Sequence, residues 1–252
     1  MNQEQLKKIW LDEEKNASII GWDFSYLENR YREEDDLPWD YKNVISKYLK
    51  SDHKLLDIDT GGGEFLLSLN HPYHQTFATE GYLPNVKLCI ERLTPLGVKV
   101  LECNDPSKIG FSDESFDIII NRHGSYDPKE IYRLLKKGGY FITQQVGADN
   151  DFDLVKKVLP NAAKSFPNHY LENEIKKFID LDFEVVESDE AYLPIHFYDV
   201  GALVWFAKII EWEFVDFSVD KCFNELLKLQ EELDNFGKIE GTIHRFYFAL
   251  KK

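Results

Sequence analysis

A run of three glycines stands between an apolar stretch and a helix-like pattern in the first third of the chain. The mainly apolar stretch lies within residues 55–59, Gly61 to Gly63 follow it, and apolar residues then repeat at helical spacing over 65–69. We expect a strand, a tight turn and a helix. Glycine lets a ligand approach the backbone closely, and the N–H groups at a helix start attract an electron-rich group. The turn is a candidate nucleotide-binding loop, with a packing role as the alternative.

Acidic residues occupy the ends of the next two expected strands. Glu80 ends the strand 76–80, and Asp105 follows the strand 98–102. A carboxylate at the position of Glu80 can accept two hydrogen bonds from a ribose diol. A carboxylate at the position of Asp105 can accept a hydrogen bond from an exocyclic amine. Each acid alone is equally consistent with a solvated loop. Together, behind a glycine turn, they favour a nucleoside-binding site.

Strands and helices alternate through the middle of the chain, which predicts a doubly wound α/β fold with a mostly parallel sheet. The expected strands are 55–59, 76–80, 98–102, 116–120, 140–143 and 183–186. A helix that starts at Asp127 and Pro128 is expected to end at Gly138 and Gly139. Ligands bind such sheets outside the carboxyl ends of the strands. One crevice should therefore be surrounded by residues 59–63, Glu80, 104–105 and 121–123.

We expect a single domain, residues 1–252, built on a core of residues 51–190. Residues 1–50 carry charged, amphipathic and aromatic segments and are predicted to form a helical cap. Residues 191–242 are apolar at first and amphipathic later, which predicts a helical insertion that serves as a lid over the crevice or as a dimer surface. Residues 243–252 are predicted to form the last strand.

Composition argues against several classes of protein. The formal charge of −15 makes a nucleic-acid partner improbable, because phosphate binding relies on Lys and Arg. The three cysteines lack metal or redox spacing and no metal-ligand cluster stands out, so we expect no metal. There is no apolar run of membrane-spanning length and no signal-peptide pattern, so we expect a cytoplasmic protein without membrane contact.

Four motifs in order resemble those of the class I S-adenosylmethionine-dependent methyltransferases, over residues 40–190 and the final strand. Residues 56–63 look like the glycine-rich first motif, and Glu80 matches the acid that holds the ribose hydroxyls. Residues 104–117 resemble the segment whose aspartate reads the adenine amine, and 134–139 resemble the turn into the fifth strand. The resemblance implies methyltransferase activity and a seven-stranded sheet whose last strand is antiparallel.

The cofactor that the resemblance implies is S-adenosyl-L-methionine. The residues expected to bind it are Asp57, Asp59, Thr60, Gly61, Gly63, Glu80, Gly81, Asn104, Asp105, Pro106 and Asn121. Asp59 departs from the family, which has glycine there, and its carboxylate would repel the methionine carboxylate or attract the sulfonium, depending on the geometry. A nicotinamide dinucleotide is the alternative cofactor, but Leu66 stands where its fingerprint needs a third glycine.

Methyl transfer requires a nucleophile held about 3 Å from the methyl carbon in a closed, dry site. His123, just past the expected strand 116–120, is the candidate catalytic residue, either as a base or as an orienter of the acceptor. A loop histidine that only makes a local hydrogen bond is the alternative. The acceptor pocket is expected to include Trp22, Tyr126, Gln144, Gln145, His196 and Asp199.

The acidic composition and the abundant aromatic residues favour a small-molecule acceptor. Methylation of RNA or protein is one alternative, and it would require a basic face beside the crevice. A second alternative, suggested by Asp59, is a module that binds the cofactor without turnover; Asp59→Gly should then raise cofactor affinity. The sequence is compatible with a monomer or a homodimer.

Overall fold

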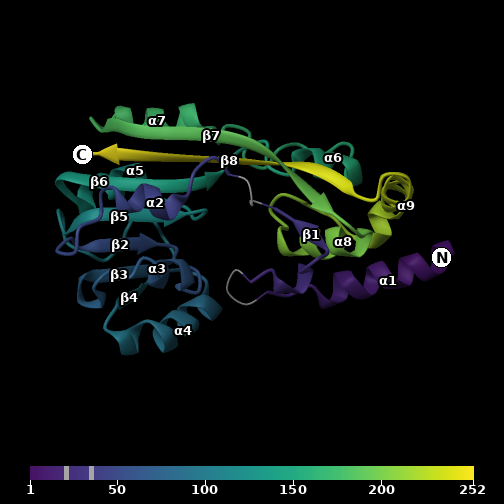
Figure 1. The fold of residues 1–252 in the computed structure, drawn as a ribbon, viewed down its shortest axis with the longest axis horizontal. Coiled ribbons are helices and arrows are strands. Elements are labelled where there is room, and N and C mark those ends of the chain that lie inside the picture. The colour runs from purple at the N-terminus through teal and green to yellow at the C-terminus, as the bar shows by residue number, and fades with distance from the viewer. Residues whose placement is uncertain (20–22, 34–36) are drawn as a thin grey trace.

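An eight-stranded sheet runs through the computed structural model, which describes residues 1–19, 23–33 and 37–252. Across the sheet the strand order is β1-β7-β8-β6-β5-β2-β3-β4 (Figure 1). The strands are β1 Tyr31–Arg32, β2 Leu55–Ile58, β3 Thr76–Glu80, β4 Lys99–Glu102, β5 Phe116–Arg122, β6 Leu135–Val146, β7 Glu184–Phe197 and β8 Ile239–Lys251. Strands β2 to β6 pair in parallel, whereas β8 is antiparallel to both β6 and β7. The predicted α/β fold with a mostly parallel sheet is confirmed.

The sheet has one strand more than the seven expected. The addition is β1, which pairs antiparallel with β7 and sets Tyr31 opposite Phe197 and Arg32 opposite His196. This strand lies within residues 1–50, for which the sequence predicts a helical cap. A two-residue strand is too short to show a periodicity of its own, so pairing with β7 defines it.

The turn from helix α5 (Pro128–Leu134) into β6 also differs from the prediction. The Asp127 carboxylate caps the helix as expected, accepting a hydrogen bond from the Glu130 N–H at 2.9 Å. The helix ends before the two glycines, because the chain already pairs with β5 at Leu135. Gly138 has a φ of +81° and lies where β6 shifts its register against β5. The glycines therefore serve a strand irregularity and not the end of the helix.

Strands β7 and β8 are much longer than predicted and pair over residues 184–197 and 239–251. In Figure 1 both extend beyond the parallel strands to a second group of helices, where α1, α6, α8 and α9 gather. The expected insertion at 191–242 therefore begins and ends inside strands. The helical excursion between the strands contains α8 Val200–Ile209 and α9 Val219–Phe236.

Three apolar clusters hold these layers together. Two lie on opposite faces of the parallel strands, because neighbouring residues such as Ile118 and Ile119 point to opposite sides. The third joins α1 (Gln3–Asn16) and the two excursion helices to the far ends of β7 and β8, with Trp10 and Trp205 buried in it. The remaining helices are α2 Tyr41–Ser46, α3 Glu64–Ser68, α4 Leu83–Arg92, α6 Phe152–Val158 and α7 Leu171–Ile179, with 3₁₀ turns η1 Ser25–Leu27, η2 Tyr73–Gln75 and η3 Thr94–Leu96.

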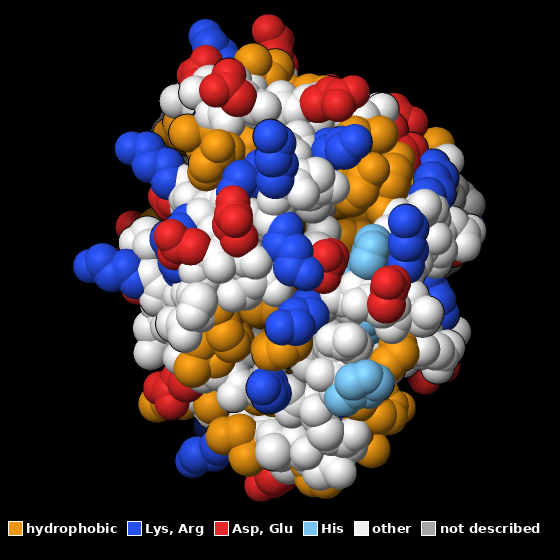
Figure 2. Space-filling view, turned by 90° about the vertical axis from the view of Figure 1, so that its left-hand side faces the viewer, with side chains coloured by type: hydrophobic (Ala, Val, Ile, Leu, Met, Phe, Trp, Pro, Cys, Tyr) orange, Lys and Arg blue, Asp and Glu red, His pale blue; other side chains and the backbone are white. Residues whose placement is uncertain are grey.

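The two ends of the parallel strands face different surroundings. Figure 2 views the amino ends, where lysine, arginine and acidic side chains are interspersed among hydrophobic ones. The carboxyl ends point toward the second group of helices (Figure 1). Among the described residues, no helix is long and apolar enough to span a membrane.

Candidate functional site

The glycine turn after β2 has the backbone that the sequence predicts for a ligand loop. Asp59 and Gly61 have φ values of +56° and +65°, and Gly63, which starts α3, has +80°. A Cβ added to Gly61 would meet no atom within 4 Å, so the backbone there faces open space. A Cβ on Gly63 would instead strike the Leu93 side chain, 2.8 Å away. The first glycine leaves room for a ligand, and the third allows close packing against α4.

Glu80, at the end of β3, holds the glycine turn in place. One of its carboxylate oxygens accepts a hydrogen bond from the Gly61 N–H at 2.8 Å. The other accepts bonds from the N–H groups of Gly81 and Tyr82 at 3.0 and 2.9 Å. The carboxylate is therefore fixed in position at the strand end. Carboxylate oxygens accept more than one hydrogen bond each, so capacity for a ribose hydroxyl remains.

Asp57 and Asp59 add two more acids beneath the turn. Asp57 accepts a hydrogen bond from the Thr60 hydroxyl at 2.6 Å, and burial raises the pKa of its carboxyl to about 7. Asp59 accepts bonds from the backbone N–H and the hydroxyl of Ser125, at 3.1 and 3.3 Å. Burial, and then the charge of Glu80, raises the pKa of Asp59 to about 6. Asp59 thus ties the glycine turn to the loop that follows β5.

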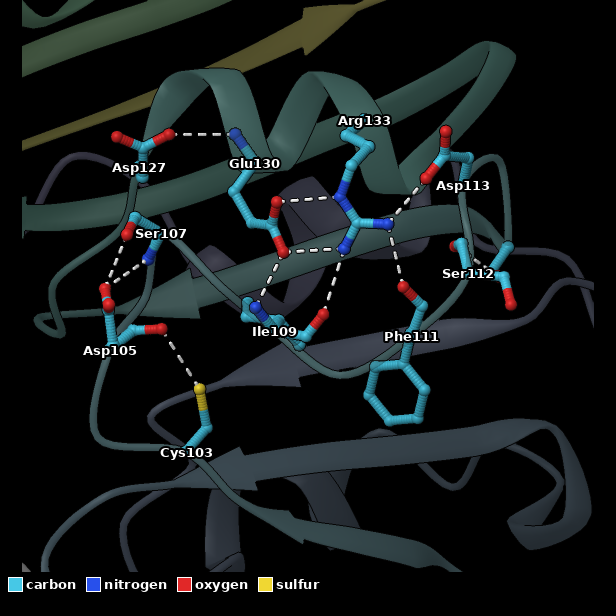
Figure 3. Close-up of polar contacts among 11 residues, drawn as sticks. Cys103, Asp105, Ser107, Ile109, Phe111, Ser112, Asp113, Asp127, Glu130 and Arg133 are labelled. Carbon is cyan, nitrogen blue, oxygen red and sulfur yellow. Dashed lines mark hydrogen bonds and ion pairs between the residues drawn. The ribbon is translucent and has the colours of Figure 1, made fainter.

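The segment between β4 and β5 is clamped to helix α5 by an ion pair between the half-buried Arg133 and the buried Glu130 (Figure 3). The Glu130 carboxylate accepts hydrogen bonds from the Ile109 N–H and from Arg133, at 2.6 and 2.7 Å. Arg133 also donates to the carbonyls of Ile109 and Phe111, at 2.9 and 2.8 Å. These bonds fix the loop that begins at Cys103.

Asp105 does not occupy the position expected of it. Its carboxylate is exposed and accepts hydrogen bonds from the N–H and hydroxyl of Ser107, at 3.0 and 2.6 Å (Figure 3). A short aspartate side chain readily bonds the backbone two residues on, which turns it away from the crevice. The neighbouring Asn104 and Pro106 do face the crevice.

These strand ends surround a cleft of about 800 Å³. It is lined by Asp23, Asp57, Asp59, Thr60, Gly61, Gly62, Glu64, Phe65, Glu80, Gly81, Tyr82, Asn85, Cys103, Asn104, Pro106, Arg122, His123, Gly124 and Ser125. The side-chain oxygen of Asn85 is buried here without a hydrogen-bond partner. Because an unpartnered buried acceptor is costly, it indicates a ligand that donates hydrogen bonds. The open face at Gly61, the fixed Glu80 carboxylate and this oxygen together fit a nucleoside cofactor.

A second cavity, of about 610 Å³, adjoins the first. The two share Arg122, which is the last residue of β5, and the three residues that follow it, His123, Gly124 and Ser125. The second cavity continues past the end of β6 and is walled by aromatic side chains from both halves of the molecule. These are Phe24, Tyr31, Tyr126, Phe152, Phe166, Phe206 and Trp212. A group bound in one cavity can therefore meet a group bound in the other at residues 122–125.

His123 stands at this junction with a φ of +61° and a defined tautomer. The indole N–H of Trp39 can only donate, and it donates to the Gln144 side-chain oxygen at 2.8 Å. This orients the Gln144 amide so that its NH₂ group faces Nε2 of His123 at 3.1 Å. Nε2 is therefore the acceptor, and in the neutral ring Nδ1 carries the proton. Trp39 and Gln144 set the tautomer of His123 through two consecutive hydrogen bonds.

The other predicted pocket residues divide into two groups. Tyr126 and Gln145 line the second cavity, while the buried Gln144 lies behind His123. His196 instead contacts Glu240 and Lys238 in the exposed pairing of β7 with β8. Asp199 caps α8 and forms an ion pair with Arg30 at 2.7 Å. Trp22 lies outside the described residues.

Two predicted cofactor residues act from behind the cleft. Asn121 is fully buried, donates to the Ile58 carbonyl at 2.9 Å and accepts from Gln145 at 2.6 Å. It therefore bonds β5 to β2 and to β6 below the cleft. Gly63 serves packing against α4, as described above.

The sequence places Arg122 at the crevice within residues 121–123, but it did not single out Ser125 at the junction, nor a polar group in the second cavity. That group consists of Glu33, Asn150, Asp151, Glu213 and Arg245. Asn150 and Asp151 follow the end of the fifth parallel strand, so the strand-end rule that identified Glu80 would also have identified them. No local signal marks Glu213 or Arg245, which come from a loop and from the middle of β8.

The strand order and the cleft at the carboxyl ends of the strands are those of the class I S-adenosylmethionine-dependent methyltransferase fold. Residues 56–143 match the family model described as a methyltransferase domain. This range contains the glycine turn, Glu80 and the loop after β4. Residues 56–143 therefore form a methyltransferase domain, a type of domain whose cofactor is S-adenosyl-L-methionine.

Solved structures agree with this fold. The chain is similar to a proposed methyltransferase from Bacillus halodurans, with 17% identity, a TM-score of 0.57, and coverage of 84% of this chain and 98% of that one. The YcgJ protein of Bacillus subtilis is 17% identical, with a TM-score of 0.57, and the match covers 84% of this chain and 97% of that one. A protein of unknown function from Deinococcus radiodurans R1 is 11% identical, with a TM-score of 0.57, and the match covers 98% of this chain and 97% of that one. No curated protein matches the sequence significantly.

Proposed function

We propose that this methyltransferase acts on a small-molecule acceptor held in the second cavity. The supporting observation is the junction of the two cavities at residues 122–125. A cavity of about 610 Å³ with aromatic walls has the size and lining typical of sites for small organic ligands. An acceptor bound there reaches the cofactor cleft at residues 122–125.

Each side of the junction has a separate task in this proposal. Glu80 binds the ribose hydroxyls, and Asn85 and Asn104 accept or donate hydrogen bonds farther along the cleft. When bound, S-adenosylmethionine supplies a methyl group whose bonding electron pair stays on sulfur while the acceptor's lone pair forms the new bond. Nε2 of His123 accepts a hydrogen bond from Gln144, so this nitrogen does not act as a base toward the acceptor. The role of His123 in this proposal is to position the acceptor at the junction. Tyr126 and Gln145 complete the acceptor wall.

The test uses S-adenosylmethionine labelled in its methyl group and three separate acceptor pools: metabolites, total RNA and total protein. We expect label in the metabolite pool only. A Glu80→Ala variant should bind the cofactor more weakly in calorimetry and lose the transfer, whereas Glu102→Ala, at the exposed end of β4, should do neither. NAD should not bind either protein.

The result can also contradict the proposal. Label confined to RNA or to protein would assign the second cavity to a flipped base or an inserted side chain. Cofactor binding with no transfer to any pool would favour a binding module without turnover.

A further inference from the structure

Two acids, the buried Asp151 and the half-buried Glu213, lie together in the part of the second cavity that the cofactor cleft does not share. Asp151 precedes α6 and is 1% exposed, and Glu213 follows α8. The side-chain NH₂ of Asn150 joins them, donating to Asp151 at 2.7 Å and to both Glu213 oxygens at 3.2 Å. The second oxygen of Asp151 is buried and receives no hydrogen bond from an N–H or hydroxyl group; the Asp151 and Glu213 carboxyls can hydrogen-bond to each other only when one of them is protonated. We refer to Asp151 and Glu213 as the acid pair.

The charges that face the acid pair do not balance it. Arg245 on β8 is directed to Glu33 at 2.5 Å and to the Asn150 oxygen, so this guanidinium already faces a third carboxylate. Asp153 of α6 adds a further negative charge nearby. Burial raises the pKa of Glu213 to about 7 and that of Asp151 well above its usual range. Near neutrality the pair therefore retains a proton.

The lysines of the same cavity are engaged with other acids. Lys164 pairs with Asp149, and Lys177 pairs with Glu174 at 2.6 Å. Among the described residues, no three His, Cys, Asp or Glu side chains are arranged to hold a metal ion. A positively charged organic group is therefore the ligand that the buried Asp151 oxygen, which lacks an N–H donor, and the excess of carboxylates fit best. Aromatic walls such as Phe206 and Trp212 attract cations in addition.

We propose that the acid pair binds a protonated amine of the methyl acceptor. This inference rests on the proposed function and names the chemical class of its substrate. The bound ammonium has no lone pair, so it is the anchor and not the nucleophile. A different atom of the same molecule extends to residues 122–125 and receives the methyl group. Binding displaces the proton that the acid pair retains, and that proton is released to the solvent.

The test uses three probes that share one skeleton: 2-phenylethylamine, 2-phenylethanol and 3-phenylpropionate. Their binding is measured by calorimetry on the full chain, near pH 7, in two buffers of different ionisation enthalpy. We expect the amine to bind about ten-fold more tightly than the alcohol, as one charged hydrogen bond implies, and the carboxylate to bind least. The buffer dependence should show release of a proton with the amine only.

Two variants and one matched control assign the effect. Asp151→Asn and Glu213→Gln should each remove most of the amine preference and the proton release; asparagine tolerates the φ of +51° at position 151. Glu211→Gln changes an exposed acid on the same segment, paired with Lys208, and should leave both unchanged. Cofactor binding by every variant verifies that it is folded.

The outcomes separate this inference from the proposed function. Equal affinity for amine and alcohol, no binding of either, or a preference that persists in both variants would overturn the amine site. Transfer of labelled methyl to metabolites could still occur in that case, and the proposed function would stand. An amine preference in a chain that transfers methyl only to RNA or protein would instead contradict the proposed function alone.

Discussion

Asp59 takes a left-handed backbone conformation, with a φ of +56°, which glycine adopts most readily. Aspartate is among the few residues that adopt this conformation at modest cost, so the turn keeps its shape. The side chain packs against Gly124, where an added Cβ would lie 2.5 Å from that of Asp59, and bonds to Ser125. Asp59 therefore links the cofactor loop to the junction loop. The departure from the family pattern connects the two cavities without disturbing the fold of the turn.

His123 depends on Gln144 for its tautomer, which leads to a prediction at the residue scale. Gln144→Leu keeps the side chain's bulk but removes the hydrogen bonds to His123 and Trp39. Methyl transfer should slow about ten-fold, the order expected from one lost hydrogen bond at the reacting end, while cofactor affinity stays unchanged. Steady-state kinetics and calorimetry measure the two quantities.

The matched control for this prediction is Gln230→Leu, on the surface of α9, which should alter neither quantity. An unchanged transfer rate in Gln144→Leu would show that the orientation of His123 is irrelevant to the reaction. A loss of cofactor binding of the same size would show that the effect is structural.

At the scale of elements, α5 acts as the fixed support of the loop between β4 and β5. The Glu130 carboxylate is buried, and Arg133 is its ionic partner. Removing one member of a buried ion pair leaves an uncompensated charge. The cofactor cleft is therefore stabilised by a helix that does not line it.

Arg133→Ala should lower the free energy of unfolding by about 2 to 4 kcal/mol, because the Glu130 carboxylate remains buried without its partner. Cofactor affinity should fall as well, since Asn104 and Pro106 lose their fixed position. Urea unfolding and calorimetry measure these changes. Lys129→Ala, an exposed change on the same helix, is the control. A loss no larger than that of the control would mean that the clamp is dispensable.

The extended strands β7 and β8 determine the second cavity. They carry α8 and α9 and pair with β1, so aromatic side chains from the N-terminal segment and from α8 meet over the end of β6. The sequence predicts an insertion in this region that closes the crevice or forms a dimer surface. The arrangement supports the first of these as a proposal, with the excursion forming a wall of the acceptor cavity.

Among the described residues, several acids that are buried or half-buried have a pKa raised toward neutrality. The pKa is raised to about 7, 6 and 7 for Asp57, Asp59 and Glu213. Such a group stabilises the fold below its unfolded pKa and loses that contribution as pH rises through its folded pKa. For Glu174, hydrogen bonds from His169 and Lys177 offset the effect of burial and lower the pKa to about 2. It stabilises the fold above pH 4.5 and loses that contribution as pH falls.

We therefore expect the stability of the protein without ligands to be greatest near pH 5. Between there and pH 8 the free energy of unfolding should fall by about 2 to 5 kcal/mol, given about 1.4 kcal/mol per unit of pKa difference and some mutual compensation. Urea unfolding at a series of pH values measures the profile. Asp59→Asn should flatten part of the decline and serves as the internal check. Stability that rises steadily from pH 5 to pH 8 would contradict the prediction.

Much of the cofactor half could be predicted from the sequence because its signals are local. A glycine turn, an acid at the end of a strand and a capped helix each occupy a few consecutive residues, and parallel strands bring their carboxyl ends together. Glu80, Gly61 and Asp127 were identified on this basis. The sequence predicts that Asp105 faces the cleft, whereas its carboxylate bonds Ser107 instead. Which of the two occurs depends on the conformation of the loop, and the sequence pattern does not indicate that conformation.

The sequence by itself determined the parallel core, the class of cofactor and the position of His123 at a strand end. Only the tertiary structure decided the acceptor cavity, because its walls come from segments far apart in the chain. Asp151, Glu213 and Arg245 meet only where two long strands continue past the sheet, and hydrophobic periodicity does not indicate where such strands end. For the same reason His196 and Asp199, which look like pocket residues in the sequence, lie on an exposed strand pair and at a helix cap.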